Sequence, residues 1–240
     1  MYSFTAAAAT HVGHVRDLNE DSYLLRDGLY LVADGMGGHD GGELASAAVV
    51  DTFRQAWEKH TDALDLESLQ AWLTQANRAV YDIAEGRAGT TLTLLTNVFH
   101  QGQEQLVVAN VGDSRTYRYR ANDEAFLQLT QDHSAVAEMV RLGQLSAQEA
   151  REHPARNVIT RAVGSSLRLL ADVVLLEADV GDRFLLCTDG LTGEVDDQEI
   201  GLVLAAAASV QDAADQLVEV ALDTDGSDNV TVLVAEVTEN

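Results

Sequence analysis

Leu29–His39 reads LYLVADGMGGH, and Arg183–Gly193 reads RFLLCTDGLTG. Each stretch begins with an apolar run that has the pattern of a buried strand, and each run reaches Asp-Gly. We therefore expect Asp34 and Asp189 at the mouths of two buried strands, with the glycine that follows letting the backbone turn at once. Two carboxylates presented in this way indicate a metal site.

Two further acids lie beside apolar runs. Asp113 follows LVVANVG, and Asp228 stands just before NVTVLVAEV. Four acids at strand ends would repel one another and raise each other's pKa values unless cations lay between them. Ligand oxygens from carboxylates, carbonyls and water favour Mg²⁺ or Mn²⁺. We expect Asp34 to bridge two such ions, with the Gly35 carbonyl as an added ligand.

A water held between two such ions would supply hydroxide near neutral pH, which suits the transfer of a phosphoryl group to water. In HVGHVRDLNEDS, Arg16 is the candidate phosphate clamp, since a guanidinium can hold two phosphate oxygens. Glu20 and Asp21 can reach the ions through water. A single Asp-Gly is more often a turn and a single arginine more often a surface residue, so the hypothesis depends on the combination.

Composition limits the possible partners and compartments. The 240 residues carry 15 Lys and Arg against 39 Asp and Glu, a net charge of −24, which argues against nucleic-acid or anionic-membrane surfaces. Cys187 is the only cysteine, so no intrachain disulfide forms, and its apolar surroundings predict a buried residue. The longest apolar run, IGLVLAAAASV, is shorter than the ~20 residues that span a bilayer. We expect a cytoplasmic monomer.

The chain alternates β-rich and α-rich blocks. Apolar stripes predict helices near 45–56 and 66–83, and alanine-rich helices are predicted from about Asp197 and about Ser209. Between them, TLTLLTNVF, LVVANVG, TYRYR and FLQL predict antiparallel neighbours joined by short turns. Segment 134–157 contains a capping box, Ser146 with Glu149, and predicts short helices in a flap. We expect one α+β domain over 1–240, with stacked antiparallel sheets and helices outside.

A series of motifs resembles a known family. In order, the chain carries RDLNEDS, VADGMGGHDGGE, GTT, ANVGDSR, LTQDHS, NVITRAVG, CTDGL and SDNVTVLV. This series, which spans nearly the whole chain, resembles the bacterial branch of the protein phosphatase 2C-like, metal-dependent (PPM) Ser/Thr phosphatases. The resemblance implies a central β-sandwich of two antiparallel sheets, flanked by helices on both outer faces.

The resemblance also implies roles for individual residues. Two core metals would be bridged by Asp34, with Gly35 ligating one ion, Asp189 and Asp228 the other, and Asp113 with Asp189 a weaker third site. Arg16 matches the family's phosphate-binding arginine, and Glu20 and Asp21 match its acids that act through water.

One position departs from the family pattern. Eukaryotic relatives carry a histidine directly after Asp-Gly that is thought to protonate the leaving group, whereas this chain has Met36, which cannot donate a proton. His39 is a candidate substitute, and protonation by metal-bound water is the alternative. We interpret the remaining motif histidines as structural: His11, His14, His133 and His153.

Two functions of different classes follow. In the first, the chain hydrolyses phosphoserine and phosphothreonine on phosphorylated proteins, and so reverses a bacterial Ser/Thr kinase by acting on that kinase or its substrates. In the second, it is a non-catalytic relative that binds phosphoproteins or metals as a regulator. The enzyme is favoured because every acid that the metals need, and Arg16, is present. GMGGHDGG misses the spacing of a dinucleotide loop, and DTDGSDN that of a Ca²⁺ loop.

Overall fold

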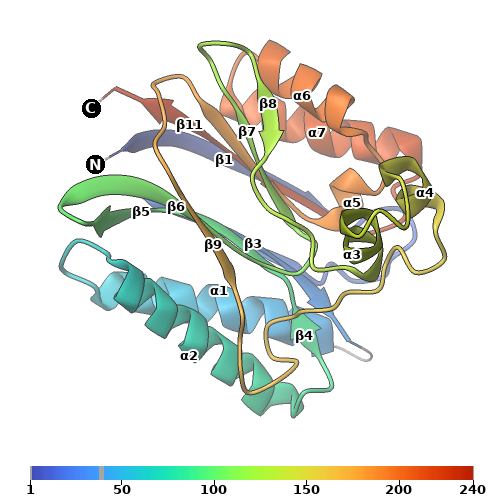
Figure 1. Ribbon diagram of the computed structural model, residues 1–240, viewed down its shortest axis with the longest axis horizontal. Helices are drawn as coiled ribbons and strands as arrows, with labels where there is room; N and C mark the ends of the chain where they lie inside the picture. Colours follow the sequence, from blue (N-terminus) through green and yellow to red (C-terminus); the bar gives the residue numbers. More distant parts are fainter. Residues whose placement is uncertain (1, 38–40, 240) are drawn as a thin grey trace.

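The strands form two antiparallel sheets that pack face to face (Figure 1). The computed structural model describes residues 2–37 and 41–239. The first sheet has the order β1 (Ser3–His11), β11 (Val230–Thr238), β10 (Arg183–Cys187), β7 (Arg115–Tyr119) and β8 (Phe126–Gln128). The second has the order β2 (Asp21–Arg26), β3 (Leu29–Met36), β5 (Leu92–His100), β6 (Gln103–Val111) and β9 (Asp172–Leu176), while β4 (Gly89–Thr90) pairs with β3.

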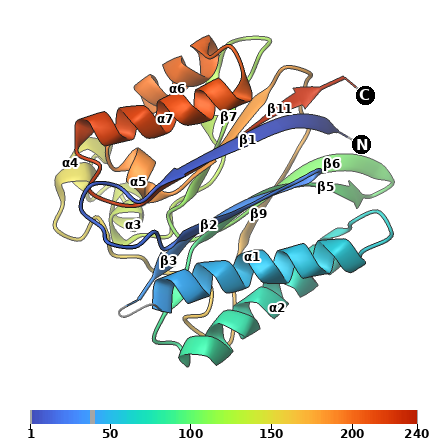
Figure 2. The same ribbon diagram turned by 180° about the vertical axis from the view of Figure 1, so that it is seen from behind.

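Helices cover both outer faces of this sandwich. α1 (Gly41–Lys59) and α2 (Leu66–Ala84) lie on the second sheet, and α6 (Asp197–Ala206) and α7 (Val210–Thr224) lie on the first (Figures 1 and 2). The predicted α+β sandwich with helices outside is therefore confirmed. Both chain termini lie at one end of the sandwich, and the short helices α3 (Ala135–Arg141), α4 (Ala147–Glu152) and α5 (Asp189–Thr192) gather at the other.

The apolar runs are continuous because their strands are buried on both faces. In β3, Leu29 and Leu31 face α1 and α2, while Tyr30 and Val32 face the opposite sheet. Successive side chains of a strand point to opposite faces, so a strand between two apolar layers needs apolar residues at every position. β10 follows the same rule, and Cys187 in it is buried as predicted.

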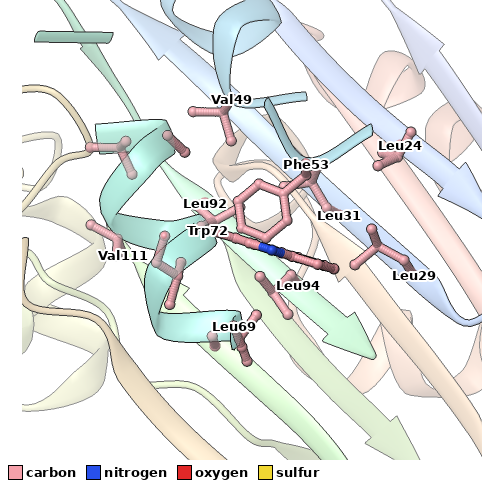
Figure 3. Packing of buried hydrophobic residues seen from close by; sticks show 14 of the residues in the cluster. Leu24, Leu29, Leu31, Val49, Phe53, Leu69, Trp72, Leu92, Leu94 and Val111 are labelled. Atoms are coloured by element: carbon pink, nitrogen blue, oxygen red, sulfur yellow. The ribbon is translucent and has the colours of Figure 1, made fainter. Parts of the chain in front are cut away.

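The core between α1, α2 and the second sheet is built on aromatic packing (Figure 3). Phe53 and Trp72 meet edge to face with ring centroids 6.2 Å apart, above Leu31 and Leu94 of the sheet. Edge-to-face contacts of this kind add to the free energy gained by burial alone. The predicted stripe on α2 is confirmed from Leu69 to Val80, but its last predicted member, Ile83, lies in the final turn of the helix and is 49% exposed.

One predicted strand pairing is wrong. β5 and β6 form the expected hairpin, through Gln101 and Gly102 in the left-handed conformations that suit such turns. β6 and β7, however, lie in different sheets, although only Gly112–Ser114 separates them. Gly112 has a φ of 101°, a left-handed value that lets the chain leave one sheet and enter the other. This crossing places Asp113 between the two sheets.

Segment 134–157 contains the predicted short helices. Ser146 accepts a hydrogen bond from the Glu149 backbone N–H, and the Glu149 carboxylate accepts one from the Ser146 N–H, so the predicted capping box is present. Ser134 caps α3 in the same way, through the Ala137 N–H.

The sequence pattern gives no clear signal for the N-terminal strand β1. Its central residues are alanines, which carry no strong strand preference, and it forms only by pairing with β11 at the far end of the chain. In the part of the chain that the structure describes, no helix combines the length and the apolar character needed to cross a bilayer.

Candidate metal and phosphate site

The first Asp-Gly pair lies inside a strand and makes no turn, so that expectation is wrong. β3 continues through Gly35 to Met36, and the Asp34 N–H donates to Thr91 Oγ1 at 2.9 Å. A Cβ on Gly35 would lie 2.2 Å from the Gly42 carbonyl oxygen and 2.6 Å from that of Glu20. Glycine is required here because the backbones of Gly42 and Glu20 approach it closely. The start of α1 can therefore pack against the residue that follows Asp34.

The second Asp-Gly pair is corrected in the same way. Asp189 is the first residue of α5, directly after Thr188, so the strand passes into a short helix instead of a tight turn. A Cβ on Gly190 would lie 2.0 Å from the Asn229 carbonyl oxygen. This close approach holds Asp189 beside the segment that carries Asp228.

Strand register brings Asp21 to Asp34. The two residues are direct partners in the antiparallel pair β2 and β3. The Thr188 hydroxyl donates to Asp21 Oδ2 at 2.9 Å, while Asp21 Oδ1 is buried and has no hydrogen-bond partner among the described residues. A buried carboxylate oxygen without a donor is costly, so this atom fits a bound cation or an ordered water.

Four carboxyl groups have raised pKa values. Burial raises the pKa of Asp21 to about 7 and that of Asp113 to about 8, and the Asp189 charge adds to both shifts. Burial, then the charges of Asp21, Asp189 and Asp113, raise the pKa of Asp34 well above its ordinary value. Burial, then the charge of Asp228, raise that of Asp189. Acids from five separate segments are thus near enough to repel one another, at the end of the sandwich opposite the termini.

This donor set fits a hard divalent cation. The cluster presents carboxylate oxygens, which are the ligands that Mg²⁺ and Mn²⁺ prefer, and a cation among them would offset the repulsion that raises the pKa values. Within residues 2–37 and 41–239, no three His, Cys, Asp or Glu side chains converge closely enough to form a metal cluster on side-chain geometry alone. Backbone carbonyls and water would therefore have to complete the coordination.

Arg16 lies at the rim of the acidic cluster. Its guanidinium donates to Asp228 Oδ2 at 2.7 Å, and this bond raises the pKa of Arg16 above its ordinary value. The side chain is 51% exposed, so its other donors can face an incoming ligand. A charged, half-exposed guanidinium beside a cation site has the geometry of a phosphate-binding group.

Asn229 fixes the loop that carries Arg16. Its side-chain nitrogen donates to the carbonyls of Val12 and Leu18 at 2.8 and 2.9 Å, and its side-chain oxygen accepts the Glu20 N–H at 2.8 Å. Gly13 passes so close to Asp228 that a Cβ there would lie 2.3 Å from the Asp228 carbonyl oxygen. The side chain of Asn229, the residue directly after Asp228, thus bonds to both ends of the loop that carries Arg16.

Glu20 is held mainly through its backbone. Its carbonyl accepts the Gly35 N–H at 3.2 Å and the Ser46 hydroxyl at 2.6 Å. Its carboxylate lies against the start of α1, where a Cβ on Gly42 would be 2.6 Å from Oε1. These contacts fix Glu20 next to Gly35.

The histidines considered in the sequence analysis have different surroundings. His39 lies outside the described residues. His14 Nε2 is 3.1 Å from the Leu222 carbonyl oxygen, while Nδ1 of His11 and of His153 accept the backbone N–H groups of Gly13 and Ala155. Backbone hydrogen bonds of this kind agree with a structural role. His133 makes more contacts, which are described below.

Sequence reasoning missed the polar residues that hold the acids in place. Thr188 occupies the N-cap position of α5, but its hydroxyl bonds to Asp21 instead of capping the helix. Thr91 accepts the Asp34 N–H, and Asn229 fixes the Arg16 loop. Thr188 and Asn229 each stand directly beside a predicted ligand in the sequence, which is the one signal that could have identified them.

Comparison with known proteins gives consistent matches. The family model for protein phosphatase 2C matches residues 13–225. The serine/threonine phosphatase stp of Listeria monocytogenes is 35% identical over 239 residues, covering 95% of this chain and 93% of its own length. The crystal structure of the Mycobacterium tuberculosis serine/threonine phosphatase PstP/Ppp superposes with a TM-score of 0.90 at 35% identity, covering 99% and 100% of the two chains.

A structure with metal bound is also similar. The catalytic domain of serine threonine protein phosphatase PstP in complex with two manganese ions superposes with a TM-score of 0.88 at 34% identity, covering 100% of both chains.

Proposed function

Since this chain belongs to the protein phosphatase 2C family and is a bacterial-type protein serine/threonine phosphatase, we propose that it hydrolyses phosphoserine and phosphothreonine with two divalent cations in the acidic cluster. The observation that carries this proposal is the cluster itself, in which buried acids with raised pKa values lie beside the half-exposed Arg16. The two manganese ions in the similar PstP structure support the choice of metal.

The acids would bind different ions of the cluster. We assign Asp34 as the bridging ligand, the Gly35 carbonyl as a ligand of one ion, and Asp189 with Asp228 as ligands of the other. Asp113 with Asp189 would hold a weaker third ion, and Glu20 and Asp21 would act through water. When bound, the cations lower the pKa of a water so that a hydroxide nucleophile is available near neutral pH.

Arg16 binds and orients the phosphate in this proposal. Its bond to Asp228 fixes the guanidinium at the rim, and the remaining N–H donors can hold two phosphate oxygens in a planar, bidentate arrangement. A fixed clamp places the phosphorus for in-line attack and spares the cost of ordering it during the reaction.

The proton for the leaving alkoxide has two candidate sources. Met36 supplies none, because a thioether has no ionisable proton. His39 and water at the cations remain the alternatives. A variant with His39→Gln separates them, since a preserved pH profile of kcat would favour water.

The partners that we propose are phosphorylated proteins, in particular a bacterial Ser/Thr kinase or its substrates. The names of the similar proteins, which are serine/threonine phosphatases, support this substrate class. We further propose that the enzyme is a single-domain cytoplasmic monomer, and that segment 134–157 is a flap that contributes to substrate choice.

Phosphate release from a phosphoserine peptide tests the proposal. We expect turnover with Mn²⁺ and none with a chelator, because the nucleophile depends on the cations. Equal rates under both conditions would reject the metal mechanism. Binding of the peptide without turnover at saturating Mn²⁺ would favour the non-catalytic regulator instead.

A further inference from the structure

His133 holds Gly112 by both of its backbone polar groups. The His133 N–H donates to the Gly112 carbonyl oxygen at 2.9 Å, and the Gly112 N–H donates to His133 Nδ1 at 3.1 Å. His133 is only 5% exposed, so both bonds are shielded from water. Gly112 is the residue directly before Asp113, so this clamp sets where the Asp113 backbone begins.

The imidazole ring is locked from its other side. Because Nδ1 accepts a hydrogen bond, the ring proton is assigned to Nε2, which faces Asp172 Oδ2 at 3.1 Å. Arg161 Nη1 donates to Asp172 Oδ1 at 2.9 Å and lies 3.1 Å from Nε2. Asp172 belongs to β9, and Arg161 lies on the chain that returns from segment 134–157, so separate segments fix one ring.

Gly112 packs closely against Thr91. Its φ of 101° is left-handed, and a Cβ there would lie 2.6 Å from Thr91 Cγ2. Thr91 Oγ1 in turn accepts the Asp34 N–H and is 2.6 Å from the Ser114 hydroxyl. Asp113 is therefore flanked by two anchored residues, one held by His133 and one by the threonine that also holds Asp34.

We propose that His133 is a positioning residue for Asp113, which aims that carboxylate into the acidic cluster by clamping the Gly112 peptide. This inference rests on the proposed function, because His133 would orient Asp113 as a ligand of the more weakly bound third cation. It gives the base of segment 134–157 a direct mechanical link to the site. Removing a group that hydrogen-bonds to a metal ligand and orients it commonly lowers the metal affinity about 10- to 100-fold.

Two substitutions distinguish the contact that Nδ1 of His133 makes with Gly112 from the contact that Nε2 makes with Asp172. In His133→Asn the side-chain oxygen lies near the position of Nδ1 and can still accept the Gly112 N–H. In His133→Gln the longer amide can reach Asp172 but loses the acceptor for Gly112. We expect His133→Gln to weaken the lower-affinity Mn²⁺ binding event about tenfold or more, and His133→Asn to retain it. Isothermal titration of Mn²⁺ into each folded protein, without substrate, measures this.

A double variant and a control complete the test. Asp113→Asn should weaken the same binding event at least as much as His133→Gln does, and adding His133→Gln to it should cause little further loss, because both act on one ligand. His153→Gln is the matched control, since that ring also accepts a backbone N–H, but from Ala155 and not from Gly112. Equal Mn²⁺ binding by wild type and His133→Gln, or an equal loss in the Asn and Gln variants, would overturn the proposal.

Hydrogen exchange of the Gly112 amide tests the clamp in the wild-type protein, without a variant. In the metal-free wild type, the Gly112 N–H should exchange as slowly as the amides of β6, and fast exchange would contradict the clamp. These readouts do not depend on turnover. A wild type that bound Mn²⁺ but hydrolysed no phosphopeptide would refute the proposed function and leave the role of His133 to be judged by the titrations.

Discussion

Asp21 and Asp34 are direct cross-strand partners in β2 and β3, so their side chains lie on the same face of the sheet. Like charges in this position destabilise a sheet, and burial at this site increases the cost. The pair is held by backbone contacts on either side, including the bond from Gly35 to the Glu20 carbonyl oxygen. The fold therefore maintains a repulsive arrangement that a cation would relieve.

The first prediction concerns the bridging charge. Asp34→Asn keeps the shape of the side chain but removes one charge, so we expect turnover to fall more than about 100-fold while the metal-free protein becomes no less stable. Phosphopeptide turnover and thermal unfolding in chelator measure the two effects. The exposed Asp62→Asn is the control and should change neither. Normal turnover in folded Asp34→Asn would refute the assignment.

The second prediction is a pH dependence of the metal-free protein. The pKa of Asp21 is raised from 3.8 to about 7 and that of Asp113 from 3.8 to about 8. The folded state thus holds protons that the unfolded chain has already released. The stability that these two protonated carboxyl groups contribute is fully present below the unfolded-state pKa of 3.8, and it is lost as the pH rises through the raised pKa values of about 7 and about 8.

Urea unfolding in chelator should therefore give a free energy of unfolding that falls from pH 5.5 to pH 8.5. Saturating Mn²⁺ should reverse the trend, because cations bind the deprotonated carboxylates. A metal-free protein that gains stability over this interval would contradict the raised pKa values.

Much of the sandwich could be predicted because its strands are buried on both faces. Runs such as LYLV and FLLC contain an apolar residue at every position, and the helix stripes recur at the helical period. β1 could not be predicted in this way, since its alanines become a strand only through pairing with β11, more than two hundred residues away. The sheet change at Gly112 depends on one φ angle, which the sequence pattern does not encode.

The acids of the site could be chosen from the sequence, but their supports could not. Asp34 and Asp189 stand out because Asp-Gly follows each apolar run. The bond from Thr188 to Asp21 and the clamp from His133 to Gly112 join residues 167 and 21 positions apart. Such contacts exist only after the sheets have assembled, so a lone threonine or histidine in the sequence is compatible with many roles.

The third prediction tests the phosphate clamp. Arg16→Ala should raise the KM for a phosphopeptide about tenfold and lower kcat less, because it removes a group that binds the phosphate before and during the reaction. Arg16→Lys should recover part of the loss, since it restores charge without the bidentate geometry. Arg78→Ala, which breaks only a surface ion pair with Asp82 on α2, is the control. An unchanged KM in Arg16→Ala would contradict the clamp.

The fourth prediction concerns why glycine follows Asp34. Gly35→Ala would place a Cβ 2.2 Å from the Gly42 carbonyl oxygen, so β3 and α1 would have to separate. We expect a loss of more than about 3 kcal/mol in the free energy of unfolding, since backbone atoms cannot swing aside as a flexible side chain can. Gly102→Ala is the matched comparison, because its φ is 83° but nothing lies within 4 Å of the added Cβ. That variant should lose only about 1 kcal/mol, from backbone strain alone. Equal losses in the two variants, measured by urea unfolding in chelator, would contradict close packing as the reason for glycine after Asp34.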